Sequence, residues 1–189
     1  MLKVLARNIV NLTDARYFAA HFADVLSVPW NGTLDDMAFM NGVKAWVEGV
    51  TWALELPREH AATVAHEIDS EMVSHCLLFD RPSSVLPSDI GQWIILDDDI
   101  SLEDLYSDAH IEEVVALIVS MSWLQSLAQS QDLTIPLWIT IDEPEQLHKL
   151  EKVTIPIEGI VLSGSPEELV GLKTYENLDA ILEMCSELR

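Results

Sequence analysis

Basic residues are scarce in this chain. Only 10 of its 189 residues are Lys or Arg, against 32 Asp or Glu, which gives a formal net charge of −22. Nucleic acids and anionic membranes are recognised through clustered Lys and Arg, so the composition argues against both as partners. The same imbalance slows the approach of a phosphorylated substrate unless a local basic pocket offsets it. An acidic surface indicates solubility and does not by itself indicate a function.

Cysteines and long apolar runs are also few. Cys76 and Cys185 lie far apart in apolar contexts, which favours buried free thiols over a disulfide or a ligand role. No apolar run approaches the roughly 18 residues needed to span a bilayer, and the N-terminus lacks the pattern of a signal peptide. The sequence therefore predicts a cytoplasmic protein. It predicts no cofactor, and its histidines fit no zinc spacing.

Short apolar runs alternate with helical stripes along most of the chain. The opening segment predicts a strand at 2–6, a helix capped by Asn11 and a second strand at 25–28. Gly42 is predicted to end the next helix, at 33–41, and Pro57 to lie near the start of a third. The stretch 80–90 is rich in Pro and Ser and predicts an irregular connection without a helix. The other strands are predicted at 43–50, 74–79, 93–96, 114–120, 133–141 and 157–162.

Eight strands, nearly all separated by helices, predict a (β/α)8 TIM barrel. The strands are almost continuously apolar, as a parallel sheet buried on both faces requires. We expect one compact domain over residues 1–189, although the chain is short against the roughly 250 residues typical of this fold. An open doubly wound sheet is the alternative.

Three polar or aromatic positions follow predicted strands, at the end where barrels place their sites. Arg7 could bind an anion there, or it could pair with Glu48 or Asp97 from a neighbouring strand end. The run 97–99 is three aspartates, which hard cations can bind, but a solvated turn that caps a helix is the preferred interpretation, and no metal is predicted. Trp30 follows the second strand and could face a ligand.

Both ends of the chain resemble phosphoribosylanthranilate isomerase. Three features are similar to the opening of that family: the run Asn-Leu-Thr-Asp-Ala-Arg at 11–16, an alanine-rich helix, and Ala-Asp-Val-Leu at 23–26. The closing part of the chain is similar to the end of that family's sequences, in Ser163-Gly164, the run 171–173 and the final helix. The resemblance implies an eight-stranded barrel that converts an aminoaldose to an aminoketose in tryptophan synthesis. It also implies a Cys general base on strand one and an Asp general acid near strand six.

The positions that match the family's reacting groups have changed. The alignment puts Arg7 at the Cys position and Asn8 beside it, and an arginine stays protonated in proteins and cannot act as a base. The sixth strand ends without a carboxylate, and the family's Ser-Pro-Arg after strand two is replaced by 30–32. After strand eight, Ser163, Gly164 and Ser165 could still offer amides to a phosphate. After strand seven, the acidic run 142–145 would repel one.

Three hypotheses follow. The first is a divergent barrel without the parent isomerase activity that binds a small phosphorylated or anionic metabolite at its C-terminal mouth, around Arg7, Asn8, Trp30 and 163–165. The second is an active isomerase in which Asp97 or Asp80 is the acid or base, which requires a carboxylate at the mouth with a raised pKa. The third is a non-catalytic interaction protein whose acidic surface meets a basic partner. The oligomeric state stays open.

Overall fold

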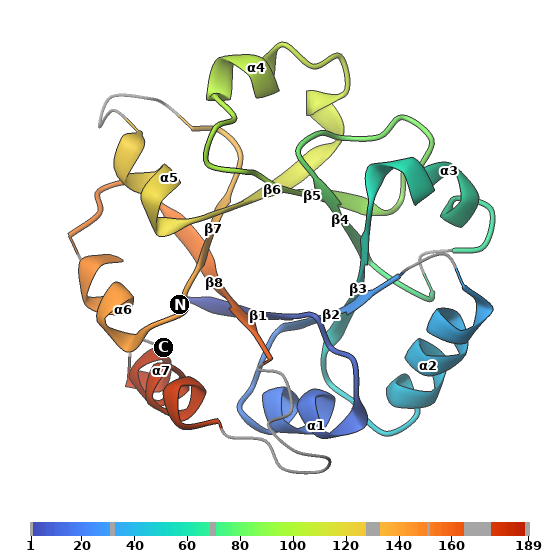
Figure 1. Ribbon diagram of the computed structural model, residues 1–189, viewed down its shortest axis with the longest axis horizontal. Helices are drawn as coiled ribbons and strands as arrows, with labels where there is room; N and C mark the ends of the chain where they lie inside the picture. Colours follow the sequence, from blue (N-terminus) through green and yellow to red (C-terminus); the bar gives the residue numbers. More distant parts are fainter. Residues whose placement is uncertain are drawn as a thin grey trace.

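Eight parallel strands close into a barrel in the order β1 to β8, with helices around the outside (Figure 1). The computed structural model describes residues 2–30, 33–68, 71–127, 133–150, 152–164 and 175–187. The (β/α)8 fold is therefore confirmed, and the open doubly wound alternative is wrong. The strands are β1 (Lys3–Arg7), β2 (Val25–Pro29), β3 (Thr51–Leu56), β4 (His75–Phe79), β5 (Gly91–Ile95), β6 (Val114–Val119), β7 (Leu137–Thr140) and β8 (Ile157–Ser163).

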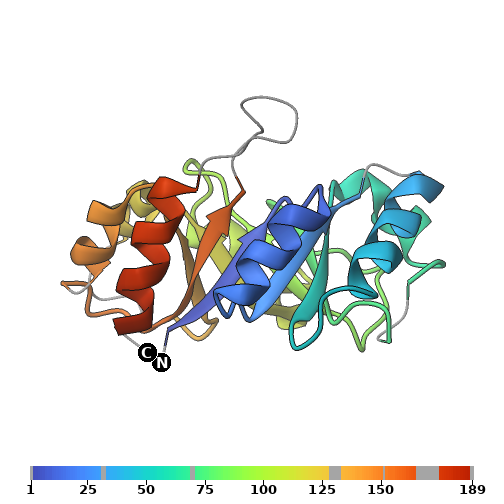
Figure 2. The same cartoon turned by 90° about the horizontal axis from the view of Figure 1, so that it is seen from below.

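The helices pack against the outer face of this barrel, which is seen edge-on in Figure 2. Asn11 caps α1 by accepting a hydrogen bond from the backbone amide of Asp14, as the sequence predicts. None of the described helices is long and apolar enough to cross a membrane. The helices are α1 (Leu12–Ala20), α2 (Leu34–Lys44), α3 (Ala61–Val64), α4 (Leu102–Tyr106), α5 (Met121–Ser126), α6 (Pro144–Leu150) and α7 (Glu176–Glu187), with 3-10 turns η1 (Arg58–His60) and η2 (Ile111–Glu113).

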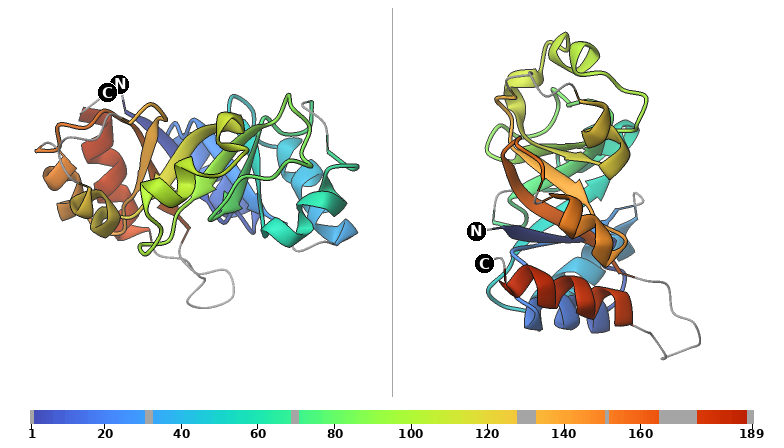
Figure 3. Two further views of the ribbon diagram at one scale, coloured as in Figure 1. Left: turned by 90° about the horizontal axis from the view of Figure 1, so that it is seen from above. Right: turned by 90° about the vertical axis from the view of Figure 1, so that its left-hand side faces the viewer.

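The ends of the chain meet where α7 lies beside α1 (Figure 3). The rings of Tyr17 and Tyr175 stack with their centroids 3.9 Å apart. Each hydroxyl donates to an aspartate on the other side of the seam: Tyr17 to Asp179 at 2.5 Å, and Tyr175 to Asp14 at 2.6 Å. Burial and the Asp179 carboxylate raise the pKa of Tyr17, so this phenol keeps its proton.

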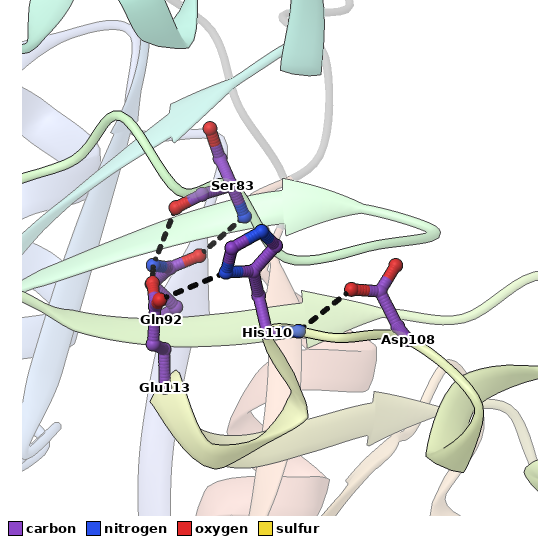
Figure 4. Close-up of polar contacts among 5 residues, drawn as sticks. All are labelled: Ser83, Gln92, Asp108, His110 and Glu113. Atoms are coloured by element: carbon purple, nitrogen blue, oxygen red, sulfur yellow. Dashed lines mark hydrogen bonds and ion pairs between the residues drawn. The ribbon is translucent and has the colours of Figure 1, made fainter.

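No helix joins β4 to β5, as predicted, and a buried glutamine anchors the irregular segment instead (Figure 4). Gln92 on β5 is 2% exposed. Its Oε1 accepts from the amide of Ser83 at 2.7 Å, and its Nε2 donates to the Ser83 carbonyl at 2.8 Å and to Glu113 at 2.7 Å. His110 lies 3.1 Å from the other oxygen of Glu113, and its own amide donates to Asp108. Gln92 thus satisfies both backbone groups of Ser83 and ties the irregular segment to β5.

The third strand was predicted in the wrong place. The segment 43–50 is not a strand, because α2 continues past Gly42 to Lys44 and β3 begins only at Thr51. Val43 and Val47 are four residues apart and both buried, so they extend the apolar face of the helix and its following turn. The correction moves Glu48 to the N-terminal end of the barrel and brings Glu55 to the C-terminal end.

Phe22 follows α1 with φ 61°, in the left-handed region that a C-terminal cap usually gives to glycine. The amide of Ala23 bonds back to the Phe18 carbonyl at 3.0 Å, as such caps do. The Phe22 side chain is 76% exposed, so it gains little packing in return. We expect Phe22→Gly to raise the free energy of unfolding by about 0.5–1 kcal/mol, measured by urea denaturation.

Ala20→Gly is the matched control for this prediction. Ala20 is an exposed residue of the same helix with ordinary helical geometry, so glycine there should cost about 0.5–1 kcal/mol. A loss of stability in both variants would mean that the left-handed geometry of Phe22 is not strained.

Candidate functional site

An ion pair bridges the C-terminal mouth of the barrel. Arg7, the last residue of β1, places Nη2 2.6 Å and Nε 3.1 Å from Oε2 of Glu55 on β3. The two side chains are 16% and 7% exposed. The guanidinium also lies 5.8 Å from the ring centroid of Phe79 on β4. Each of the three residues lies two positions beyond a residue that fills the barrel interior, so their side chains converge across the mouth.

Glu55 is held by four donors. Besides the two from Arg7, its Oε1 accepts from the backbone amide of Asn8 at 2.7 Å and from the Ser27 hydroxyl at 2.5 Å. Asn8 adopts φ 56°, which asparagine tolerates better than most residues, and this turn aims its amide at the carboxylate. Two donors on each oxygen fill the accepting capacity of the carboxylate. The predicted partners of Arg7, Glu48 and Asp97, are therefore wrong, because the misplaced third strand concealed Glu55.

The backbone amides after β7 already have an acceptor. Asp142 and Glu143 both donate to Oε1 of Gln146 on α6, at 2.7 and 3.1 Å. After β8, Ser163 is exposed, and the amide of Gly164 points to the carbonyl of Arg7 at 3.5 Å. Ser165, the third residue predicted for phosphate binding, lies outside the described residues. The amides after β7 that could have bound a phosphate are thus already bonded to a side chain of this chain.

A carboxylate does reach the end of β6, although it comes from the loop after β5. Asp98 accepts hydrogen bonds from the hydroxyls of Ser120 and Ser122, the second at 2.5 Å. These two bonds lower the pKa of Asp98, so it is ionised at neutral pH and has no proton to donate. The sequence carries a signal for this contact that we missed, because both segments follow neighbouring strands.

Asp80 is the titrating group that best fits acid–base chemistry. It follows β4 with φ 69° and lines a cavity of about 310 Å³ together with Phe79 and Glu59. Partial burial and the negative charges of Asp97 and Asp99 raise its pKa. Its Oδ1 is buried without a hydrogen-bond partner among the described residues. The structure therefore brings together Asp80 and Asp97, the two predicted candidates.

Trp30, which follows the second strand where it could face a ligand, is a buried residue in the structure. It is 2% exposed and packs edge-on against His60, with ring centroids 5.8 Å apart. Cys76 is also buried, and burial raises the pKa of its thiol to about 12, which excludes it as a nucleophile at neutral pH. Among the residues that the structure describes, no group of three or more His, Cys, Asp or Glu side chains is arranged to hold a metal ion.

The fold places this chain among the TIM barrels. Comparison with known proteins shows which solved barrels it is similar to. No family model and no curated protein matches the sequence. Among solved structures it is similar to phosphoribosylanthranilate isomerase from Thermus thermophilus, with 16% identity, a TM-score of 0.72 and full coverage of both chains. The isomerase from Thermotoga maritima has 14% identity and a TM-score of 0.71, with 98% of this chain and 99% of that chain covered. The enzyme from Pyrococcus furiosus has 17% identity and a TM-score of 0.69, with 99% and 100% covered.

Identities this low show the fold alone. The chain is a TIM barrel like that of phosphoribosylanthranilate isomerase along its whole length. The likeness does not carry that enzyme's activity to this chain, and the contacts at the mouth have to be judged by themselves.

Proposed function

We propose that this chain is an isomerase-like barrel that does not catalyse the isomerisation of phosphoribosylanthranilate. The Arg7–Glu55 bridge carries this proposal. The resemblance implies a cysteine base where Arg7 stands, and a guanidinium cannot accept a proton. Because Glu55 is bonded by four donors, it is not free to replace that base.

The other groups that the reaction would need are already engaged in contacts within the chain. Asp98, the carboxylate that reaches the C-terminal end of the sixth strand, has a lowered pKa and cannot serve as the acid. The amides after β7 are bonded to Gln146. The charge of Arg7 is offset by Glu55, and Asp80, Asp97 and Asp99 follow the next two strands. These groups disfavour a phosphorylated or anionic metabolite at this mouth and favour a non-catalytic barrel.

One observation favours an active isomerase as a second candidate. Asp80 combines a raised pKa with a position on a small cavity at the mouth, which is the environment that a general acid or base needs. The two candidates make opposite predictions for the same assay.

The test is to incubate the purified chain at high concentration with N-(5'-phosphoribosyl)anthranilate and to follow the loss of substrate fluorescence. We expect no turnover above background from the wild type. An authentic isomerase added to the same mixture shows that the substrate is competent. Turnover that Asp80→Asn abolishes and Asp89→Asn preserves would establish the second candidate. Turnover that survives Asp80→Asn would also refute the proposal and point to another group.

Asp80→Asn should also be slightly more stable than the wild type at neutral pH. It removes one of three neighbouring negative charges and puts asparagine at a left-handed position that suits it. Because Asp80 is partly exposed, we expect a gain on the order of 0.5 kcal/mol. A carboxyl with a raised pKa lowers stability as the pH rises through that pKa, so the gain should shrink as the pH falls.

Urea denaturation at pH 7.5 and pH 5 measures this difference. Asp89→Asn removes the same charge from an exposed turn and should change little. An equal gain in both variants would assign the effect to net charge and not to the Asp80 cluster.

A further inference from the structure

Two large aromatic side chains are exposed at the N-terminal end of the barrel, opposite the mouth just described. Phe22 lies in the turn between α1 and β2 and is 76% exposed, and Trp46 lies in the turn between α2 and β3 and is 68% exposed. They are the two most exposed large apolar side chains in the part of the chain that the structure describes. Exposed apolar surface of this kind marks a contact surface when it is gathered in one place.

The two turns are neighbours in the structure. β2 and β3 pair in parallel, and the amide of Thr51 donates to the carbonyl of Asp24 at 2.9 Å where the two turns end. Phe22 and Glu48 line the same cavity, of about 810 Å³, and Trp46 stands two residues before Glu48. We call Phe22, Asp24, Trp46 and Glu48 the N-terminal patch.

The cavity beside the patch is closed by aromatic rings on its inner side. Trp93 and Trp138 line it from the barrel interior, but they are only 5% and 2% exposed. The Trp138 ring lies against Gly159, where a Cβ would stand 2.5 Å from it. These two rings therefore offer no open face to a ligand, and apolar contact at this end falls to the exposed rings of the turns.

The charge around the patch is negative. Asp24 and Glu48 line the cavity, and Glu48 is exposed and forms no ion pair among the described residues. Of the described residues that line the cavity, the one lysine or arginine is Lys3, and it is paired with Glu158 at 2.5 Å. With a formal net charge of −22 on the whole chain, the field at this end attracts cations. The patch therefore suits a partner that brings lysine or arginine.

A contact within the chain shows how a guanidinium packs on this surface. Arg16 of α1 is exposed, and its guanidinium lies 5.3 Å from the ring centroid of Trp46. Tryptophan is the aromatic residue that attracts a cation most strongly, and it is enriched at the energetic centres of protein interfaces. Because Trp46 stays 68% exposed with Arg16 in place, a further side chain can pack on its ring.

Phe22 costs the fold stability at the position where it stands. Its φ of 61° makes it a rare outlier for a bulky residue, and glycine there is expected to be more stable. Backbone strain of this kind persists where function requires the side chain. A binding role accounts for an aromatic ring at a strained and exposed position, whereas solubility alone would favour its loss.

A second copy of this chain is a poor occupant of the patch. In a two-fold dimer the same surface meets itself, so Asp24 and Glu48 of both copies would be brought together. Each copy also carries the formal net charge of −22, and like charges across an interface cost affinity. A basic partner avoids both penalties.

We propose that the N-terminal patch docks a basic segment of another protein, one in which apolar side chains alternate with arginine or lysine. Its apolar side chains cover the rings of Phe22 and Trp46, and its cations meet Asp24 and Glu48 at the rim of the cavity. The proposal is independent of whether the opposite mouth is catalytic, because the patch and the mouth lie at opposite ends of the strands.

Fluorescence anisotropy with three labelled nonapeptides tests the proposal on the intact chain. The first peptide alternates arginine with leucine, the second alternates arginine with serine, and the third alternates glutamate with leucine. We expect the arginine–leucine peptide to bind at least about tenfold more tightly than either of the others, because it alone offers both cations and apolar side chains. Its affinity should also fall as the salt concentration rises.

Three variants of the patch locate the binding site. Phe22→Gly, Trp46→Ser and Glu48→Gln should each weaken binding of the arginine–leucine peptide about threefold or more. Phe22→Gly is expected to be more stable than the wild type, so weaker binding by this variant cannot be ascribed to unfolding. Two matched controls are Tyr106→Ser, an exposed aromatic residue of α4 across the barrel from α1 in Figure 1, and Glu59→Gln, an exposed carboxylate at the opposite mouth. Both should leave the affinity within about twofold.

Four results would contradict this proposal. They are an arginine–leucine peptide that binds no more tightly than the other two, no binding of that peptide at millimolar concentration, and equal losses of affinity in the patch variants and their controls. The fourth is a dimer, detected by sedimentation, that Phe22→Gly dissociates, because a second copy of the chain would then cover the patch.

Discussion

Replacing Glu55 with alanine is expected to cost about 3–5 kcal/mol of the free energy of unfolding, more than any other substitution considered for this barrel. The variant leaves the Arg7 guanidinium, 16% exposed, without its counter-charge. It also leaves the amide of Asn8 and the hydroxyl of Ser27 without the acceptor that they share. Breaking one member of a buried ion pair costs far more than the pair contributes, because the remaining charge stays desolvated.

Urea denaturation against two controls separates the ion pair from other effects. Glu59→Ala removes an exposed carboxylate near the same mouth and should change stability by less than about 0.5 kcal/mol. The double substitution Arg7→Met with Glu55→Leu removes both charges and should recover the part of the loss that comes from the unpaired guanidinium. The Asn8 amide and the Ser27 hydroxyl stay without their acceptor in this variant. A cost below about 1 kcal/mol for Glu55→Ala would mean that the bridge is not structural. Arg7 would then be available to a ligand, and the proposed function would lose its main support.

The barrel could be predicted because its strands are buried on both faces and read as apolar runs at regular intervals. The same signal failed at β3, where two consecutive apolar segments, 43–50 and 51–56, both look like strands. The first segment was chosen because Gly42, just before it, was expected to end the helix. In the structure α2 runs through Gly42 to Lys44, and Gly42 has no positive φ, so this glycine marks no turn.

The misplaced third strand concealed the contact between Arg7 and Glu55 at the mouth of the barrel. Parallel strands bring their C-terminal ends together, so the sequence could group Arg7, Asp80 and Asp97 at one mouth. It could not show that Glu55 belongs there as well, since its strand was misplaced. The order of the strands indicates that Asp98 lies near the end of β6, but the hydroxyls that it bonds, like the amides that bond Gln146, depend on how the loops fold, which no periodicity encodes. The N-terminal cavity depends on ring orientation beside Gly159, which also appears only in three dimensions.

Gln92→Glu is the second substitution with a large expected effect, although it changes few atoms. The glutamine amide donates to the Ser83 carbonyl and to the Glu113 carboxylate (Figure 4). An ionised carboxylate at this buried position would face both of these acceptors with no proton to offer. We expect a loss of about 3 kcal/mol at pH 8, measured by urea denaturation. Gln125→Glu makes the same change at an exposed position of α5 and should cost less than about 0.5 kcal/mol.

The pH dependence identifies the cause of this loss. Burial beside Glu113 should raise the pKa of the introduced carboxyl in the folded chain above its value in the unfolded chain. The folded state then binds the extra proton first, so stability relative to the wild type should recover as the pH falls from 8 to 5. Once protonated, the group can donate to the Ser83 carbonyl while its other oxygen accepts from the Ser83 amide, as Gln92 does. A loss of equal size at both pH values would show that shape, and not charge, sets the requirement for glutamine. A variant as stable as the wild type would mean that the segment between β4 and β5 does not depend on Gln92.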